Sequence, residues 1–223
     1  MGFIVIILRK PLEKLVKQAE VVFWDFDGVI KDSVQVKSLA FQQMFSEYGF
    51  DVVNRVRCHH ERNGGMSRFE KFPLYLSWAN QTVTDEKIED LCNIFSLLVQ
   101  QSVIDSNWVD GFLDFFACHI EEKTHILVTA TPTEEINEIL KALNIRHFFS
   151  NVHGAPQAKS HAIAETLRTL DVGFNGAIML GDSESDYRAA EENNVLFLLR
   201  GTDLNKKLQG LCKGRVFKDF ING

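Results

Sequence analysis

The sequence of 223 residues is 45% hydrophobic and 24% charged, a balance typical of a folded protein and not of a disordered chain. This length suffices for one core with a small inserted domain. The formal net charge of −6 gives no general attraction to nucleic acid or to an anionic membrane, so neither is expected as a partner and an anionic ligand would need a local binding site.

The amino-terminal segment is apolar over residues 3–8, which is too short to span a bilayer. Its positive charges follow the apolar run, whereas a secretory signal carries them in front. We interpret the segment as an extra strand or a tethered arm. The 4 cysteines are scattered without a C-x-x-C pair, which indicates isolated thiols in a reducing compartment. These features predict a cytoplasmic protein.

Four short apolar runs predict the strands of a parallel sheet. They are continuous and not alternating, as in strands covered on both faces, and they span residues 21–26, 125–129, 177–180 and 195–199. Apolar residues at helical spacing over residues 134–143 and 163–170 separate the later runs. This alternation predicts an α/β fold with a doubly wound, Rossmann-like parallel sheet.

Residues 32–108 carry a different pattern. Apolar residues recur there at helical spacing, as around Phe41, Leu74 and Phe95, and no run has the character of a strand. Such a segment after the first strand predicts an all-helical domain inserted into the α/β core. We therefore divide the chain into a core of residues 1–31 and 109–223 and a helical domain of residues 32–108.

Two aspartates stand at the end of the first predicted strand, Asp25 and Asp27, and Gly28 follows. Strand residues two apart point to the same side, and open α/β sheets form their ligand crevice at the carboxyl ends of the strands. Two adjacent carboxylates repel each other, and a hard cation such as Mg²⁺ would relieve the repulsion. Capping of the next helix is the alternative role, but Asp32 and Ser33 are better placed for it.

Three other predicted strand or helix ends carry polar residues of the same kind. Asp182 follows a buried strand and Asp186 lies in the first turn of the next helix, in "GDSESD". Thr129 closes a strand ahead of Ala130, where a hydroxyl and backbone amides can hold an oxyanion. Lys159 begins a helical pattern. Each feature alone is common in structural roles, because strand-end threonines often cap helices and helix lysines are usually solvated.

The order D-x-D-G, Thr, Lys, G-D-S-x-x-D resembles the phosphatase branch of the haloacid dehalogenase superfamily, across residues 25–186. "DFDGVI" and "GDSESD" match as they stand, whereas Ala130 replaces the asparagine or serine of many relatives and Ser160 replaces the common proline. The resemblance implies that Asp25 is the nucleophile and Asp27 the general acid and base. It also implies that Thr129, Ala130 and Lys159 bind the phosphoryl oxygens.

The resemblance further implies a Mg²⁺ cofactor. Its ligands would be Asp25, the backbone carbonyl of Asp27 and Asp182, with Asp186 orienting them. An acid at position 27 favours phosphoryl transfer over carbon–halogen cleavage, because a halide leaves without being protonated. The implied substrate is a small phosphorylated metabolite.

The inserted helices resemble the cap of phosphoglycolate phosphatases and β-phosphoglucomutases. Residues 59–72 resemble the substrate-specificity loop of that cap, and residues 65–68, "GMSR", resemble the G-x-S-R of the mutases. Arg68 would open a helix and contact a phosphate or a sugar hydroxyl, unless it is a surface arginine. The neighbouring residues His59, His60 and Glu61 lack the spacing of a metal site.

These inferences favour a Mg²⁺-dependent phosphatase that hydrolyses a small phosphomonoester, a sugar phosphate or similar metabolite, through an aspartyl-phosphate intermediate. A phosphomutase of the β-phosphoglucomutase type is the second hypothesis. A non-catalytic phosphate-binding protein is a third, from a different functional class.

Overall fold

The computed structural model describes residues 5–119, 123–212 and 214–222. Six strands form one parallel sheet in the order β3-β2-β1-β4-β5-β6. The strands are β1 Val21–Trp24, β2 Thr124–Pro132, β3 Asn151–Ala155, β4 Ala177–Gly181, β5 Leu196–Arg200 and β6 Val216–Phe217. The four apolar runs of the sequence correspond to β1, β2, β4 and β5, whereas β3 and β6, at the two edges of the sheet, were not predicted.

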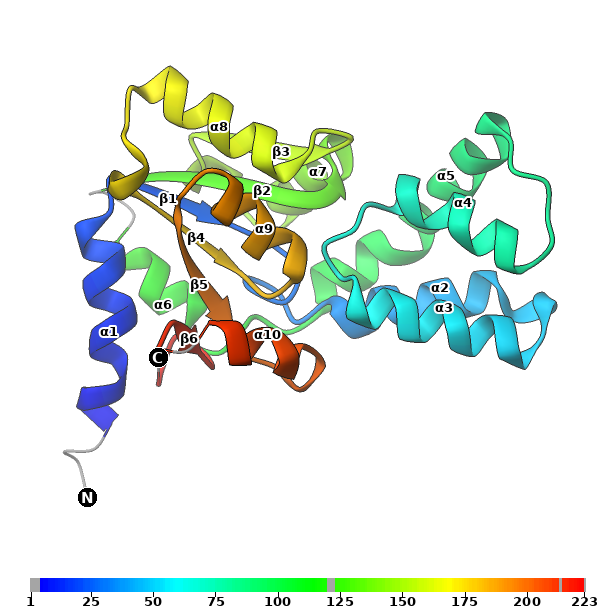
Figure 1. Ribbon diagram of the computed structural model, residues 1–223, viewed down its shortest axis with the longest axis horizontal. Helices are drawn as coiled ribbons and strands as arrows, with labels where there is room; N and C mark the ends of the chain where they lie inside the picture. Colours follow the sequence, from blue (N-terminus) through cyan, green and yellow to red (C-terminus); the bar gives the residue numbers. More distant parts are fainter. Residues whose placement is uncertain (1–4, 120–122, 213, 223) are drawn as a thin grey trace.

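Helices cover both faces of the sheet (Figure 1). Val22 and Trp24 pack with helices α1, α6 and α7, and Val21 and Phe23 pack with α8, α9 and α10. The alternation along β1 thus separates two cores, as a doubly wound sheet requires. The bounds are α1 Val5–Gln18, α6 Phe112–Ala117, α7 Thr133–Ala142, α8 Lys159–Leu170, α9 Glu184–Glu192 and α10 Lys206–Leu211.

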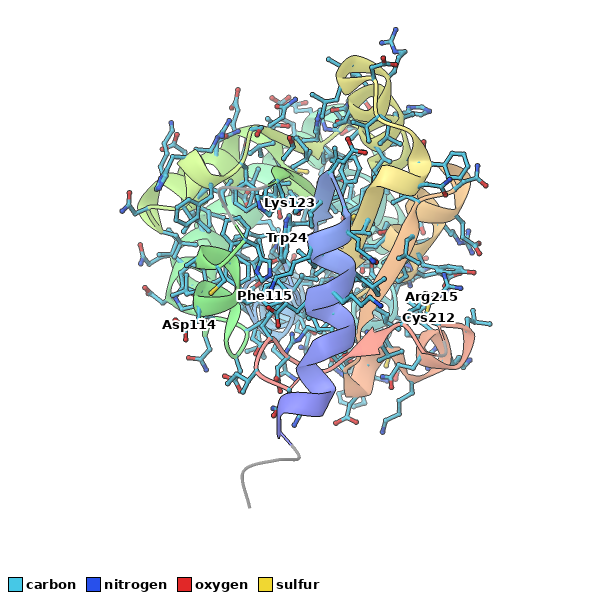
Figure 2. The ribbon with its side chains drawn as sticks, turned by 90° about the vertical axis from the view of Figure 1, so that its left-hand side faces the viewer. Trp24, Asp114, Phe115, Lys123, Cys212 and Arg215 are labelled. Atoms are coloured by element: carbon cyan, nitrogen blue, oxygen red, sulfur yellow. The ribbon has the colours of Figure 1, made fainter. Side chains whose placement is uncertain are left out.

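The amino-terminal segment differs from the prediction of a strand or a tethered arm. It forms helix α1, although the first two residues of its apolar run lie outside the described part of the chain. Leu12 and Val16 belong to the same buried cluster as Trp24 and Phe115, and Figure 2 shows α1 lying across that end of the molecule. Among the residues described, no helix has the length and apolar character needed to cross a membrane.

The inserted segment is helical, as predicted, and no strand occurs between residues 32 and 108, all of which are described. Its helices are α2 Val34–Met44, α3 Phe50–Arg62, α4 Arg68–Trp78 and α5 Asp85–Asp105. They form a cap on the side to which the arrowheads of β1, β2 and β4 point (Figure 1). The two connections to the core run side by side, because Val109 N–H donates to the Ile30 carbonyl and Asp32 N–H to the Asn107 carbonyl.

A buried ion pair joins the cap to the core. Arg68 at the start of α4 binds Glu135 of α7 through two hydrogen bonds of 2.8 Å, and both side chains are about 95% buried, with exposed fractions of 4% and 5%. Ser96 donates to the same carboxylate, and the guanidinium lies over the ring of Phe95, 4.5 Å from its centre. A bidentate ion pair of this kind fixes the orientation of the two side chains as well as their distance.

Replacing Arg68 with methionine would leave the Glu135 carboxylate buried without its cation. We expect Arg68→Met to lower the free energy of unfolding by about 3–5 kcal/mol, measured by urea denaturation. Arg188→Met removes an exposed pair with Glu184 and is the matched control, expected to cost less than about 1 kcal/mol. A loss for Arg68→Met no larger than for Arg188→Met would contradict this account.

Candidate active site

The carboxyl ends of β1, β2 and β4 bring the predicted residues to one edge of the sheet. Asp25 is tied to β4, because its N–H donates to the Leu180 carbonyl at 2.9 Å. The chain then turns at Gly28, whose φ of +75° favours glycine. A Cβ at this position would also collide with the Asp182 carboxylate, so glycine allows the two strand ends to approach each other.

Three carboxylates converge at this edge. Oxygens of Asp25, Asp182 and Asp186 all lie within 4.8 Å of one another. Asp186 is held in place by α9, because it accepts hydrogen bonds from the backbone N–H and the hydroxyl of Ser183 at 3.1 and 2.6 Å. A set of carboxylate oxygens with little access to water suits a hard divalent cation such as Mg²⁺.

Lys159 is the cation that these carboxylates share. Its Nζ lies 2.6 Å from Asp186 and 3.0 Å from Asp25. Burial, followed by the charge of Asp186, raises the pKa of Asp25 from 3.8 to about 7, against the opposing effect of Lys159. Burial and Asp25 likewise raise the pKa of Asp182 well above its usual value. One ammonium therefore does not neutralise the three carboxylates, which leaves charge for a further cation to balance.

Asp27 has a different environment, although it is only two residues from Asp25. Its carboxylate forms an ion pair with Lys37 and accepts hydrogen bonds from Ser33 at 2.5 Å and Thr131 at 3.2 Å. Burial alone would raise the pKa of Asp27, but the ammonium of Lys37 and these hydrogen bonds hold it below its usual value. The two aspartates thus differ in the direction of their pKa shifts.

None of these three partners of Asp27 was predicted as a site residue. Ser33 is at the N-cap position of α2, as expected, but its side chain makes no capping hydrogen bond and donates to Asp27 instead. Lys37 follows Ser33 by four residues, a spacing that places both on one face of a helix. That spacing, directly after D-x-D-G, was the signal available in the sequence.

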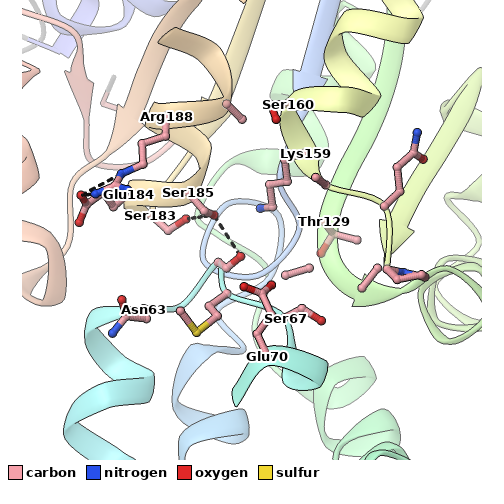
Figure 3. A pocket seen from close by; sticks show the side chains of 18 of the residues that line it. Asn63, Ser67, Glu70, Thr129, Lys159, Ser160, Ser183, Glu184, Ser185 and Arg188 are labelled. Carbon is pink, nitrogen blue, oxygen red and sulfur yellow. Dashed lines mark hydrogen bonds and ion pairs between the residues drawn. The ribbon is translucent and has the colours of Figure 1, made fainter. Parts of the chain in front are cut away.

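Thr129 and Ala130 lie in the wall of a small cavity of about 20 Å³ that also contacts Asp25, Asp27 and Asp182. This volume is room for about one water molecule. A larger cavity of about 360 Å³ shares Thr129 and Ala130 with it and extends past Lys159 to the cap (Figure 3). We call this small cavity the chamber; the larger cavity lies beside it.

The predicted specificity loop is shorter than expected. Residues 59–62 end helix α3 and residues 68–72 begin α4, so the loop is confined to residues 63–67. Arg68 opens a helix as predicted, but its guanidinium binds Glu135 and does not line either cavity. Ser67 and Met66 line the larger cavity in its place.

Comparisons with known proteins agree with this geometry. Residues 22–199 match the family described as haloacid dehalogenase-like hydrolase. A phosphoglycolate phosphatase from Colwellia psychrerythraea is 24% identical over 190 residues, which cover 80% of this chain and 83% of the relative.

Solved structures share the fold. The β-phosphoglucomutase of Clostridium difficile superposes with a TM-score of 0.73 at 19% identity, over 91% of this chain and 92% of the other. A predicted phosphoglycolate phosphatase from Haemophilus somnus gives a TM-score of 0.71 at 17% identity, over 92% and 96% of the two chains. With the family match extending over most of its length, the chain belongs to the haloacid dehalogenase-like hydrolases.

Proposed function

We propose that the protein is a Mg²⁺-dependent phosphatase that hydrolyses a small phosphomonoester through a phosphoryl group carried on Asp25. The observation that supports this most is the convergence of Asp25 with Asp182, Asp186 and Lys159, beside a second aspartate, Asp27. Relatives named as phosphoglycolate phosphatases agree with it.

In the first half-reaction, a carboxylate oxygen of Asp25 attacks phosphorus while the bond from phosphorus to the alcohol oxygen breaks. Asp27 donates a proton to that oxygen, and the alcohol leaves. In the second half-reaction, Asp27 takes a proton from water, whose oxygen attacks phosphorus and displaces the Asp25 carboxylate. Inorganic phosphate is released and both aspartates return to their initial states.

Asp27 is ionised in the unliganded geometry, because Lys37 holds its pKa down. A phosphate dianion bound next to Asp25 would raise the pKa of Asp27 by like-charge repulsion and so favour its protonation. The proton would therefore be present when the leaving oxygen needs it.

Asp25, Asp182, Asp186 and the backbone carbonyl of Asp27 would hold Mg²⁺, with oxygen as the only ligand atom. When bound, the ion supplies positive charge that lets an anionic nucleophile approach an anionic phosphate. Lys159 adds a second positive charge, and the Thr129 hydroxyl with the Ala130 amide would donate hydrogen bonds to phosphoryl oxygens.

The mutase hypothesis rested partly on Arg68, which we expected to contact the substrate. Because Arg68 is committed to Glu135, this part of the argument no longer favours a mutase over a phosphatase. Product analysis separates the two, since a mutase would isomerise a sugar phosphate without net release of phosphate.

Replacing Asp25 with asparagine removes the proposed nucleophile while preserving its shape. We expect Asp25→Asn to lower kcat for phosphomonoesters at least about 10³-fold, measured as Mg²⁺-dependent phosphate release. The exposed Asp114→Asn serves as control and should retain activity. Full activity in Asp25→Asn would eliminate the proposed nucleophile.

Metal binding predicts a specific pH dependence of stability. The raised pKa of Asp25 means that the folded chain holds this proton more tightly than the unfolded chain, so the stability it contributes is present below 3.8 and lost as the pH rises toward about 7. We expect Mg²⁺ to raise Tm more at about pH 8 than at about pH 5. Asp182→Asn should lose most of that gain, and an undiminished gain would contradict the assigned ligand.

Lys37→Met tests the charge beside Asp27. Removing the ammonium lets the pKa of Asp27 rise, so we expect the limb of the pH–kcat/KM profile that reports Asp27 to move to higher pH. Lys141→Met, at an exposed position on α7, is the control and should leave the profile in place. An unmoved limb in Lys37→Met would show that Asp27 does not govern it.

A further inference from the structure

The cap carries two basic side chains that the proposed chemistry does not use. His60 comes from α3 and Lys71 from α4, and they are 3% and 2% exposed. Lys71 Nζ lies 3.0 Å from His60 Nδ1. His60 also lines the chamber, the small cavity that contacts Asp25, Asp27 and Thr129. The pair is therefore placed where the cap meets the reacting groups.

Lys71 is a buried amine without an ion pair. Within the described parts of the chain, no carboxylate lies within ion-pair distance of it; its neighbours are His60, the Gly64 carbonyl at 3.5 Å and the ring of Phe41. Burial, followed by repulsion from Lys37, lowers the pKa of Lys71 to about 7, against the weaker attraction of Asp27 and Glu70. The other buried lysines of the site, Lys37 and Lys159, each bind a carboxylate, so Lys71 differs from them.

The contact with Lys71 also fixes the state of the histidine. In its protonated form Lys71 only donates hydrogen bonds, so His60 Nδ1 then accepts and the ring proton lies on Nε2. The pKa of His60 is well below its usual value because of burial and the two nearby ammoniums, which keeps the ring neutral. Nε2 is buried and makes no well-aligned hydrogen bond within the described structure, while the Val34 backbone acts as a weak hydrogen-bond acceptor for the ring. A buried N–H donor without a well-aligned partner is rare in folded proteins.

We propose that His60 and Lys71 form a subsite for a second anionic group, a carboxylate or a phosphate, on the leaving group of the substrate. This inference rests on the proposed phosphatase function and names its substrate class. The anionic group would accept the Nε2–H of His60, and the positive charge of Lys71, which contacts the opposite nitrogen of the same ring, would attract it at longer range. Because the pair is on the cap and the nucleophile is on the core, the substrate would bridge the two domains, with one anion at each end.

The subsite predicts discrimination among short phosphomonoesters of equal length. 2-Phosphoglycolate carries a carboxylate, ethylene glycol bisphosphate a second phosphate, and 2-hydroxyethyl phosphate a neutral hydroxyl. We expect the wild-type kcat/KM for at least one anionic compound to exceed that for the neutral compound by about 10- to 100-fold, the value of a charged hydrogen bond. The higher of the two anionic rates identifies the group.

Lys71→Met keeps the length of the side chain and removes its charge. The preference for the anionic compound should fall at least about tenfold in Lys71→Met and in His60→Phe, whereas Lys141→Met should keep the wild-type ratio. Two variants are used so that a folding defect in one, detected by circular dichroism, leaves the other as the test. A folded Lys71→Met that keeps the full preference, or a wild type without any preference, would overturn the proposal.

Binding separates this proposal from the proposed function. Calorimetry with Asp25→Asn in the presence of Mg²⁺ measures the affinity for the same three compounds without turnover. An anionic compound should bind Asp25→Asn more tightly than the neutral compound, and the double variant Asp25→Asn/Lys71→Met should lose this difference. That result supports the subsite even if the wild type hydrolyses none of the compounds. In that case only the phosphatase proposal is contradicted. Equal binding of all three compounds overturns the subsite even if the protein hydrolyses them.

Discussion

Repulsion between carboxylates at the carboxyl edge of the sheet is the constraint around which the site is organised. Asp25 and Asp186 share the ammonium of Lys159, and burial followed by the charge of Asp186 raises the pKa of Asp25. Asp27 has its own ammonium in Lys37, and its pKa falls. A nucleophile must be ionised and a proton donor protonated, so a bound cation would have to lower the pKa of Asp25 and a bound phosphate would have to raise that of Asp27.

The core and the cap contribute opposite charge to the chamber between them. The core supplies the aspartates and Lys159, whereas the cap supplies the cations Lys37 and Lys71 and the neutral ring of His60. A phosphomonoester is an anion that must approach an anionic nucleophile, so its attraction has to come from these local cations, given the net charge of −6. The position of the cap therefore determines how much positive charge surrounds the substrate, as well as how much space it has.

The sequence allowed prediction of the features that depend on local pattern. The continuous apolar runs identified β1, β2, β4 and β5, because both faces of those strands are buried. The edge strand β3 contains an exposed Asn151 and a glycine, and β6 has only two residues, so neither gives an apolar run. The apolar residues at the start of α1 were too few to separate a helix from a strand.

Tertiary contacts could not be predicted in the same way. The motifs located the aspartates, Thr129 and Lys159 because spacing from strand ends determines their position. The partner of Arg68 is 67 residues away on α7, so this pairing leaves no local pattern. The partner of Lys37 is only ten residues away, and its spacing after D-x-D-G was a signal that could have been read. Arg68 illustrates the difficulty: a motif arginine at the start of a cap helix is equally suited to bind a substrate or a buried glutamate.

The short loop of residues 63–67 links leaving-group selection to the carboxylate cluster. Its Gly65 carbonyl accepts a hydrogen bond from Ser185 of α9 at 3.1 Å, and a Cβ at Gly65 would meet the hydroxyls of Ser183 and Ser185. Ser183 in turn holds Asp186. The middle of the loop thus rests on the helix that orients the proposed metal-site carboxylate, and the residue after the loop is fixed by the Arg68–Glu135 pair. Because core residues hold the loop at these two points, the cap residues on either side of it can occupy a defined distance from phosphorus, which selection by the leaving group requires.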